Sequence, residues 1–161
     1  MRRAGVALVA AALAVLPARA DAFIALKATQ APAGAEQTLT FVVEHGCAGS
    51  PTVRLRVRMP AGVGAVKPHD APGWKVAASR ASAADDAPVI EVVWLGGKLE
   101  AETPGEFSIA LRLPDAPGTT LYFPVTQECE KGAVRWAEMP SATTKREALR
   151  FPAPGLTLSK K

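Results

Sequence analysis

The stretch TVRLRVRM, residues 52–59, decides the fold, because its side chains alternate strictly between apolar and polar types. The apolar set is Val53, Leu55, Val57 and Met59, and the polar set is Thr52, Arg54, Arg56 and Arg58. This period of two is typical of a β-strand that buries one face and leaves the other in water. Residues 107–113 repeat the pattern with Phe107, Ile109, Leu111 and Leu113.

Further runs rich in Val, Phe, Tyr and Trp predict strands over residues 38–44, 89–95, 120–126 and 133–139. Turn signals built on Pro and Gly separate them, as in residues 48–51, 59–62 and 115–118. Beyond residue 22 we find no sustained helical periodicity. Many short strands punctuated in this way predict an all-β fold, an immunoglobulin-like antiparallel β-sandwich.

The first 22 residues have the pattern of a secretory signal peptide. Arg2 and Arg3 precede a mostly apolar run, and small residues follow at Ala18, Ala20 and Ala22. The run is too short for a stable membrane span, and no apolar segment near the C-terminus predicts an anchor. We therefore expect a periplasmic or secreted protein without a membrane anchor, which begins at Asp21 or at Phe23 after cleavage.

Composition argues against nucleic acid as a partner. The chain of 161 residues has 19 basic and 15 acidic side chains, which become 16 and 14 when residues 1–22 are removed. A net charge of +2 gives no case for a nucleic-acid interface, which normally needs a concentrated basic face.

The two cysteines, Cys47 and Cys129, most simply form one disulfide in an oxidising compartment. Closing a loop of about 82 residues would stabilise the fold by roughly 4 to 5 kcal/mol in the chain-entropy description. The alternative is a thiol site for metal or redox chemistry, which the absence of a Cys-x-x-Cys motif disfavours.

The mature chain is long enough for one domain with a core and short for two. We predict a β-sandwich over residues 23–140, with a mobile loop over 79–88. Residues 141–161 carry basic residues and the prolines Pro152 and Pro154, and are predicted to form a basic surface tail.

Enzyme activity is not expected from this sequence. A nucleophilic hydrolase usually needs a histidine base, and His45 and His69 are the only histidines. Neither a nucleophile elbow nor a glycine-rich phosphate loop is present. His45, two residues before Cys47, is interpreted first as a loop histidine beside a disulfide and second as a ligand.

An ordered series of motifs carries a family resemblance. The motifs are Gln30-Ala31-Pro32-Ala33-Gly34, His45-Gly46-Cys47 with Gly49-Ser50-Pro51-Thr52, Lys67-Pro68 with Pro72-Gly73-Trp74, Trp94 with Gly96-Gly97, Glu106-Phe107, Leu121-Tyr122-Phe123-Pro124-Val125, and Gln127-Glu128-Cys129 with Arg135-Trp136. Together they resemble the YcnI-like family of exported copper-binding domains, over about residues 23–139.

The resemblance implies a periplasmic β-sandwich that holds Cu(II) at its N-terminus, with an unknown protein partner in copper trafficking. In that family the first mature residue is a histidine, whose amine and ring nitrogen bind the metal, helped by a carboxylate and with a tryptophan close by. Nitrogen donors suit Cu(II). By position, Trp136 matches the tryptophan and Glu44 is the carboxylate candidate, and both are our candidate metal-site residues.

This sequence departs from the family at the decisive residue, since Phe23 stands where the histidine belongs. A phenyl ring cannot ligate copper, so cleavage after Ala22 leaves the terminal amine and backbone, and cleavage after Ala20 offers the amine and carboxylate of Asp21. Trp136 is then interpreted first as a packing residue and second as metal-associated. For Glu44, a strand end or an ion-pair partner is an interpretation at least as good as a ligand role.

Two hypotheses follow from these motifs. The first is a copper-binding or copper-handling domain with an altered N-terminal site. The second is a non-metal extracytoplasmic interaction module that has lost the copper site.

Overall fold

The structure, a computed structural model, describes residues 23–161, so the predicted signal peptide lies outside the described residues. Within that range the chain forms strands and one short 3-10 helix, η1 (Arg146–Ala148). The strands are β1 (Ile24–Leu26), β2 (Gln30–Pro32), β3 (Glu36–Val43), β4 (Thr52–Arg58), β5 (Gly64–Pro68), β6 (Lys75–Arg80), β7 (Val89–Leu99), β8 (Gly105–Arg112), β9 (Thr120–Tyr122), β10 (Val125–Cys129), β11 (Ala133–Trp136) and β12 (Gly155–Ser159).

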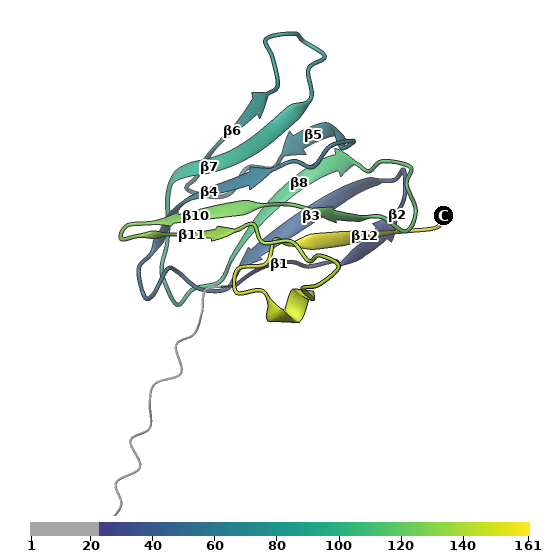
Figure 1. The fold of residues 1–161 in the computed structure, drawn as a ribbon. Coiled ribbons are helices and arrows are strands. Elements are labelled where there is room, and N and C mark those ends of the chain that lie inside the picture. The colour runs from purple at the N-terminus through teal and green to yellow at the C-terminus, as the bar shows by residue number, and fades with distance from the viewer. Residues whose placement is uncertain (1–22) are drawn as a thin grey trace, which may run out of the picture.

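The strands form two main sheets that pack as a sandwich (Figure 1). One has the order β1-β3-β8-β5 and the other the order β11-β10-β4-β7-β6. A smaller sheet, β2-β12-β9, completes the fold. The pairs within the two main sheets are antiparallel, and β12 pairs with β2 in parallel. The predicted all-β, immunoglobulin-like antiparallel sandwich is confirmed.

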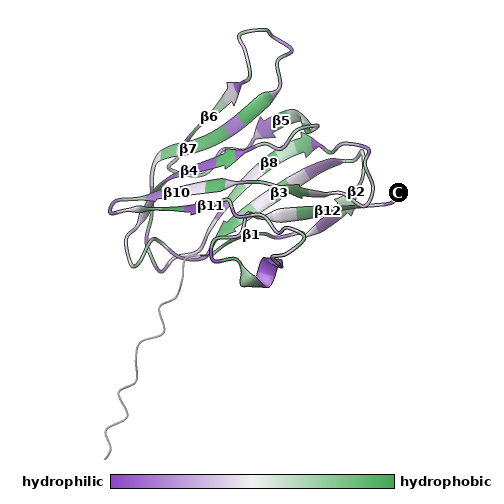
Figure 2. Cartoon of the chain, viewed as in Figure 1, coloured by the Kyte–Doolittle hydropathy of each residue, from purple (hydrophilic) through white to green (hydrophobic). Residues whose placement is uncertain are grey.

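The alternation that predicted β4 determines which of its faces is buried. Leu55 and Val57 have no exposed surface, whereas Arg54 and Arg56 lie on the opposite, outer face of the sheet. In Figure 2 most of β7 is green, with one purple segment within it. Burial of the inward side chains removes apolar surface from water, at about 25 cal/mol per Å², and holds the two sheets together.

The core between the sheets contains an aromatic cluster. The rings of Trp74 and Trp94 lie 5.1 and 5.3 Å from the ring of Phe107. The indole N–H of Trp94 donates a hydrogen bond of 3.1 Å to the carbonyl of His69, so a fully buried tryptophan keeps its polar atom satisfied. Trp74 and Trp94 are therefore packing residues.

The predicted basic tail over residues 141–161 is wrong in its last part. Residues 155–159 form β12, whose Leu156 and Leu158 are buried. Strand β12 pairs with β9 on one side and with β2 on the other. Two alternating leucines between prolines and lysines are a weak strand signal, and only pairing with segments far away in sequence buries them. The domain therefore extends beyond the predicted boundary at residue 140.

Other boundaries differ by a few residues. Ser79 and Arg80, predicted as loop, belong to β6, and the predicted strand over residues 120–126 is divided at Phe123 and Pro124 into β9 and β10. Pro124 has no N–H to donate to a strand partner, which accounts for the break. In residues 23–161 no helix is long and apolar enough to cross a membrane.

Candidate functional site

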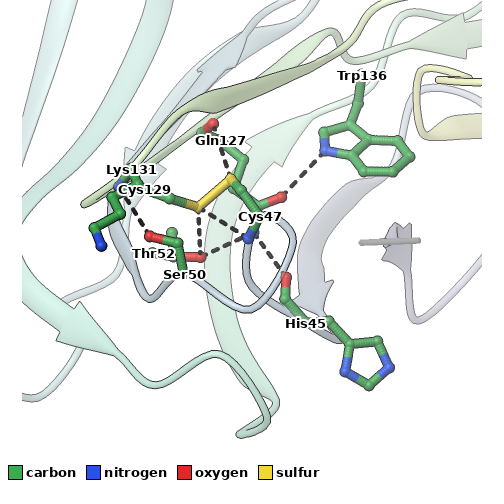
Figure 3. The surroundings of a disulfide bond; sticks show 8 residues. All are labelled: His45, Cys47, Ser50, Thr52, Gln127, Cys129, Lys131 and Trp136. Atoms are coloured by element: carbon green, nitrogen blue, oxygen red, sulfur yellow. Dashed lines mark hydrogen bonds between the residues drawn. A yellow bond between two sulfur atoms is a disulfide. The ribbon is translucent and has the colours of Figure 1, made fainter. Parts of the chain in front are cut away.

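The predicted disulfide between Cys47 and Cys129 is confirmed (Figure 3). Cys47 lies in the loop that follows β3, and Cys129 ends β10, with their Cα atoms 6.0 Å apart. The bond thus connects a loop from one main sheet to a strand of the other. Both residues are buried, and the N–H of Cys47 donates to Sγ of Cys129 at 3.1 Å.

The disulfide loop contains a tight turn over residues 47–50. The backbones of Cys47 and Ser50 exchange two hydrogen bonds, of 3.0 and 2.9 Å. Between them Ala48 and Gly49 have φ angles of 48° and 82°. Positive φ at both central residues is the geometry of a type I′ turn, which strongly favours Asn, Asp or Gly. Ala48 is therefore held in a left-handed conformation that its Cβ disfavours.

Gln127 organises the interior beside the disulfide (Figure 3). Its side chain is fully buried on β10. Its Nε2 donates to the carbonyl of His45 and to Oγ1 of Thr52, both at 2.8 Å, and its Oε1 accepts from the indole N–H of Trp136 at 3.3 Å. One amide thus links the loop after β3, strand β4 and strand β11.

The role of Gln127 was not predicted from the sequence. A signal was present, since Gln127 is two residues from Val125 and two from Cys129, on the inward face of a period-two strand. Its three hydrogen-bond partners come from segments far away or on another strand, and this convergence is a tertiary property.

The structure brings together Phe23, Glu44 and Trp136, the positions that the resemblance selected. The backbone N–H of Glu44, just after β3, donates to the carbonyl of Phe23 at 3.1 Å. The ring of Phe23 meets that of Trp136 edge to face, with centroids 6.4 Å apart, and Phe151 lies 5.5 Å from Trp136 on another side. Phe23 remains 44% exposed, whereas Trp136 is buried.

The side-chain donors at this place do not fit a tight Cu(II) centre. The indole N–H of Trp136 is engaged by Gln127, and the side chain of Phe23 supplies only a ring that packs on Trp136. Among the residues that the structure describes, the carboxylate of Glu44 makes no hydrogen bond or ion pair, and no group of three or more His, Cys, Asp or Glu side chains could hold a metal ion. The assignment of Glu44 and Trp136 to a metal site stays a prediction.

The two histidines occupy different surroundings. Nδ1 of His45 is buried without a hydrogen-bond partner and lies 3.9 Å from a carboxylate oxygen of Glu102. His69 is exposed, and its backbone N–H donates to the carbonyl of Ser108. His45 is next to Glu44 in sequence, so it is the nearer of the two to the Phe23 end.

A groove of about 530 Å³ lies beside Phe23. Apolar side chains such as Leu26, Tyr122 and Pro154 line it together with threonine hydroxyls, and Arg146 is its one charged lining residue. Nη1 of Arg146 donates to the carbonyl of Ala153 at 2.6 Å, which holds the segment around η1 against the domain. Walls of mixed apolar and polar character suit contact with another molecule better than metal coordination.

An ion-pair network lies on the outer face of the five-stranded sheet. Glu128 accepts hydrogen bonds of 2.8 Å from Arg54 and from Arg56, and Arg56 also reaches Glu91 at 3.3 Å. The hydrogen bond from Arg56 is the main reason that the pKa of Glu128 lies below its ordinary value, and Glu128 raises the pKa of Arg56 in turn. The network aligns strands β10, β4 and β7 from the solvent side.

The class of this protein is an immunoglobulin-like β-sandwich with one internal disulfide. Phe23, Trp136 and Phe151 pack together near Phe23, and we call this cluster the aromatic corner. Residues 23–158 match the family described as "Domain of unknown function (DUF1775)". The chain belongs to that family, and no curated protein sequence matches it significantly.

Two solved structures are similar to this chain. One is an uncharacterized protein from Nocardia farcinica with an immunoglobulin-like fold, 26% identical, with a TM-score of 0.70 over 84% of this chain and 97% of that one. The other is a cohesin module from a family 33 glycoside hydrolase of Clostridium perfringens, 6% identical, with a TM-score of 0.51 over 88% of this chain and 98% of that one. The second similarity concerns the fold alone.

Proposed function

We propose that this protein is an exported, non-catalytic domain of copper handling, which binds Cu(II) weakly and acts mainly through a protein partner. One observation carries the proposal: Phe23, at the position of the YcnI-like ligand, packs its ring against Trp136. The signal-peptide pattern of residues 1–22 and the Cys47–Cys129 disulfide favour an extracytoplasmic, oxidising compartment.

Weak binding follows from the donors that remain at this corner. If the signal peptide is cleaved after Ala22, the α-amine of Phe23 and the carboxylate of Glu44 are the nearby candidates, because Phe23 and Glu44 are paired through their backbones. Cu(II) is best held by several nitrogen donors in a tetragonal arrangement. One amine and one carboxylate supply too few ligands for tight binding.

The test is a calorimetric Cu(II) titration of the mature protein, with its N-terminus defined by mass spectrometry. The comparison is the variant Phe23→His, processed to begin at residue 23, and the matched control is Phe23→Ala with the same N-terminus. We expect the histidine variant to bind at least about 100-fold more tightly than the natural protein, and the alanine variant to remain weak. Equal, tight binding by all three proteins would show that the copper ligands are other residues, and His45 and Glu44 would then be the residues to mutate.

A second candidate function is a copper-independent interaction module. The aromatic corner favours it, since Phe23 and Met139 are exposed large hydrophobic residues and the groove beside Phe23 has both apolar and polar walls. A partner recovered equally well with a copper chelator and with added Cu(II), and lost with Phe23→Glu, would support this function. Recovery only with Cu(II) would support copper handling instead.

A further inference from the structure

Three rows of side chains on the outer face of the five-stranded sheet define what we call the basic face. Strand register places Arg135, Thr126, Arg56, Val93 and Ala77 in one row, Ala133, Glu128, Arg54, Leu95 and Lys75 in the next, and Arg58, Glu91 and Ser79 in the third. Each of these residues is half-buried or exposed, so the surface is accessible to solvent, and its polar stretches on β4 and β11 are purple in Figure 2.

The basic face carries five basic and two acidic residues. Residues 23–161 contain 16 basic and 14 acidic residues in all, so the rest of the domain has one more acidic than basic residue. The positive surplus of the mature chain is therefore concentrated on this face. Beyond the rows, Lys98 is paired with Glu100 and Glu130 and adds no positive surplus.

Part of the basic face is neutralised internally and part is not. Glu128 forms ion pairs with Arg54 and Arg56, and Glu91 forms an ion pair with Arg56. Among the described residues, Arg58, Arg135 and Lys75 form no ion pair, and all three are exposed. Arg135 and Lys75 lie on the two edge strands, β11 and β6, and Arg58 lies between them on β4.

From this arrangement we propose that the basic face docks an acidic protein surface. Five strands at about 4.8 Å spacing put the outer cations about 19 Å apart, so the partner must present carboxylates over a similar width. Exposed guanidinium groups bind carboxylates with two parallel hydrogen bonds, and arginine is enriched in protein interfaces. The half-buried Val93 and Leu95 between the cations supply an apolar centre that partner side chains can cover.

The proposal is independent of copper and of the Phe23 corner, because the basic face lies on another surface of the sandwich. The probe is labelled poly-L-glutamate, with binding measured by fluorescence anisotropy in 50 mM and 200 mM salt. The test variant is Arg58→Glu with Arg135→Glu. The matched control is Lys67→Glu with Arg112→Glu, which changes the net charge equally on the opposite sheet.

We expect the natural protein to bind poly-L-glutamate at low salt and to lose affinity at 200 mM, where charges are screened over about 8 Å. The test variant should bind at least about tenfold more weakly and the control less than about threefold. Milder substitutions, Arg58→Gln with Arg135→Gln, should give an intermediate loss. Equal losses in test and control variants would overturn the proposal, because net charge alone would then explain binding. Binding only to vesicles with 30% phosphatidylglycerol would also overturn it, in favour of a lipid surface.

Discussion

Replacing Gln127 by leucine tests whether the buried amide holds the sandwich together. Leucine fits the site in approximate size but makes none of the three hydrogen bonds. The indole N–H of Trp136 and the hydroxyl of Thr52 are in fully buried residues, so water cannot replace the amide there. The carbonyl of His45 belongs to a half-buried residue, which water can reach more easily.

The expected cost follows from these partners. A buried polar group that loses its hydrogen bond costs about 1 to 3 kcal/mol. The indole N–H of Trp136 is left without a partner, and the hydroxyl of Thr52 keeps only its 3.8 Å contact with Sγ of Cys129. The transfer of an apolar leucine into the core offsets part of this cost, at about 25 cal/mol per Å² of buried apolar surface. We therefore expect Gln127→Leu to lower the free energy of unfolding by about 3 kcal/mol.

The assay is urea unfolding followed by circular dichroism, with the disulfide oxidised in every variant. Gln37→Leu is the matched control, since Gln37 makes one long, exposed hydrogen bond of 3.5 Å and should change stability by less than about 0.5 kcal/mol. In a double-mutant cycle, Trp136→Phe removes the orphaned N–H, so the double variant should be less destabilised than the sum of the single ones by about 1 kcal/mol. A loss below about 1 kcal/mol for Gln127→Leu, with no coupling to Trp136, would refute the reasoning.

Two further predictions concern the turn and the outer ion pairs. Ala48→Asn should raise the free energy of unfolding by about 0.5 to 1 kcal/mol, because asparagine tolerates the left-handed conformation that alanine disfavours. Thermal unfolding checks this prediction. Unchanged stability in both Ala48→Asn and Ala48→Gly would contradict it. Glu128→Gln should be less stable than the natural protein at pH 7, with a difference that shrinks as the pH falls below about 4. The sign follows from the lowered pKa of folded Glu128, whose contribution is complete above the unfolded pKa and is lost on protonation. Urea unfolding from pH 3 to pH 7 checks it, and a constant difference would speak against the ion pairs.

Local patterns predicted the elements that depend on a period of two. The alternation in residues 54–58 required one face in water and one in the core, and this part of β4 has that arrangement. Thr52, predicted on the polar face, is buried because the strand register shifts between Thr52 and Arg54. The cysteine count and the signal-peptide pattern of residues 1–22 predicted the disulfide, because in an oxidising compartment two thiols of one small domain usually pair. The strand prediction needs only the pattern of neighbouring residues, and the disulfide prediction needs only the chemistry of two cysteines in an oxidising compartment.

The candidate site shows what pattern reasoning could reach and what it could not. The order of the motifs that resemble the YcnI-like family predicted Phe23, Glu44 and Trp136 at one site. In the structure Phe23 contacts both of the other residues, Glu44 through the backbone and Trp136 through its ring. The packing of Phe151 on the same tryptophan was not predicted, because residues 141–161 had been interpreted as a surface tail.

The sequence by itself determined the strand class of most segments, the pairing of its two cysteines and the presence of Phe23 where the YcnI-like resemblance expects a histidine. Only the tertiary structure decided that Leu156 and Leu158 belong to the core and that Gln127 joins three segments. The physical reason is that burial and hydrogen-bond satisfaction depend on partners distant in sequence. The residues next to a short strand or a single amide do not indicate which distant groups it will pair with.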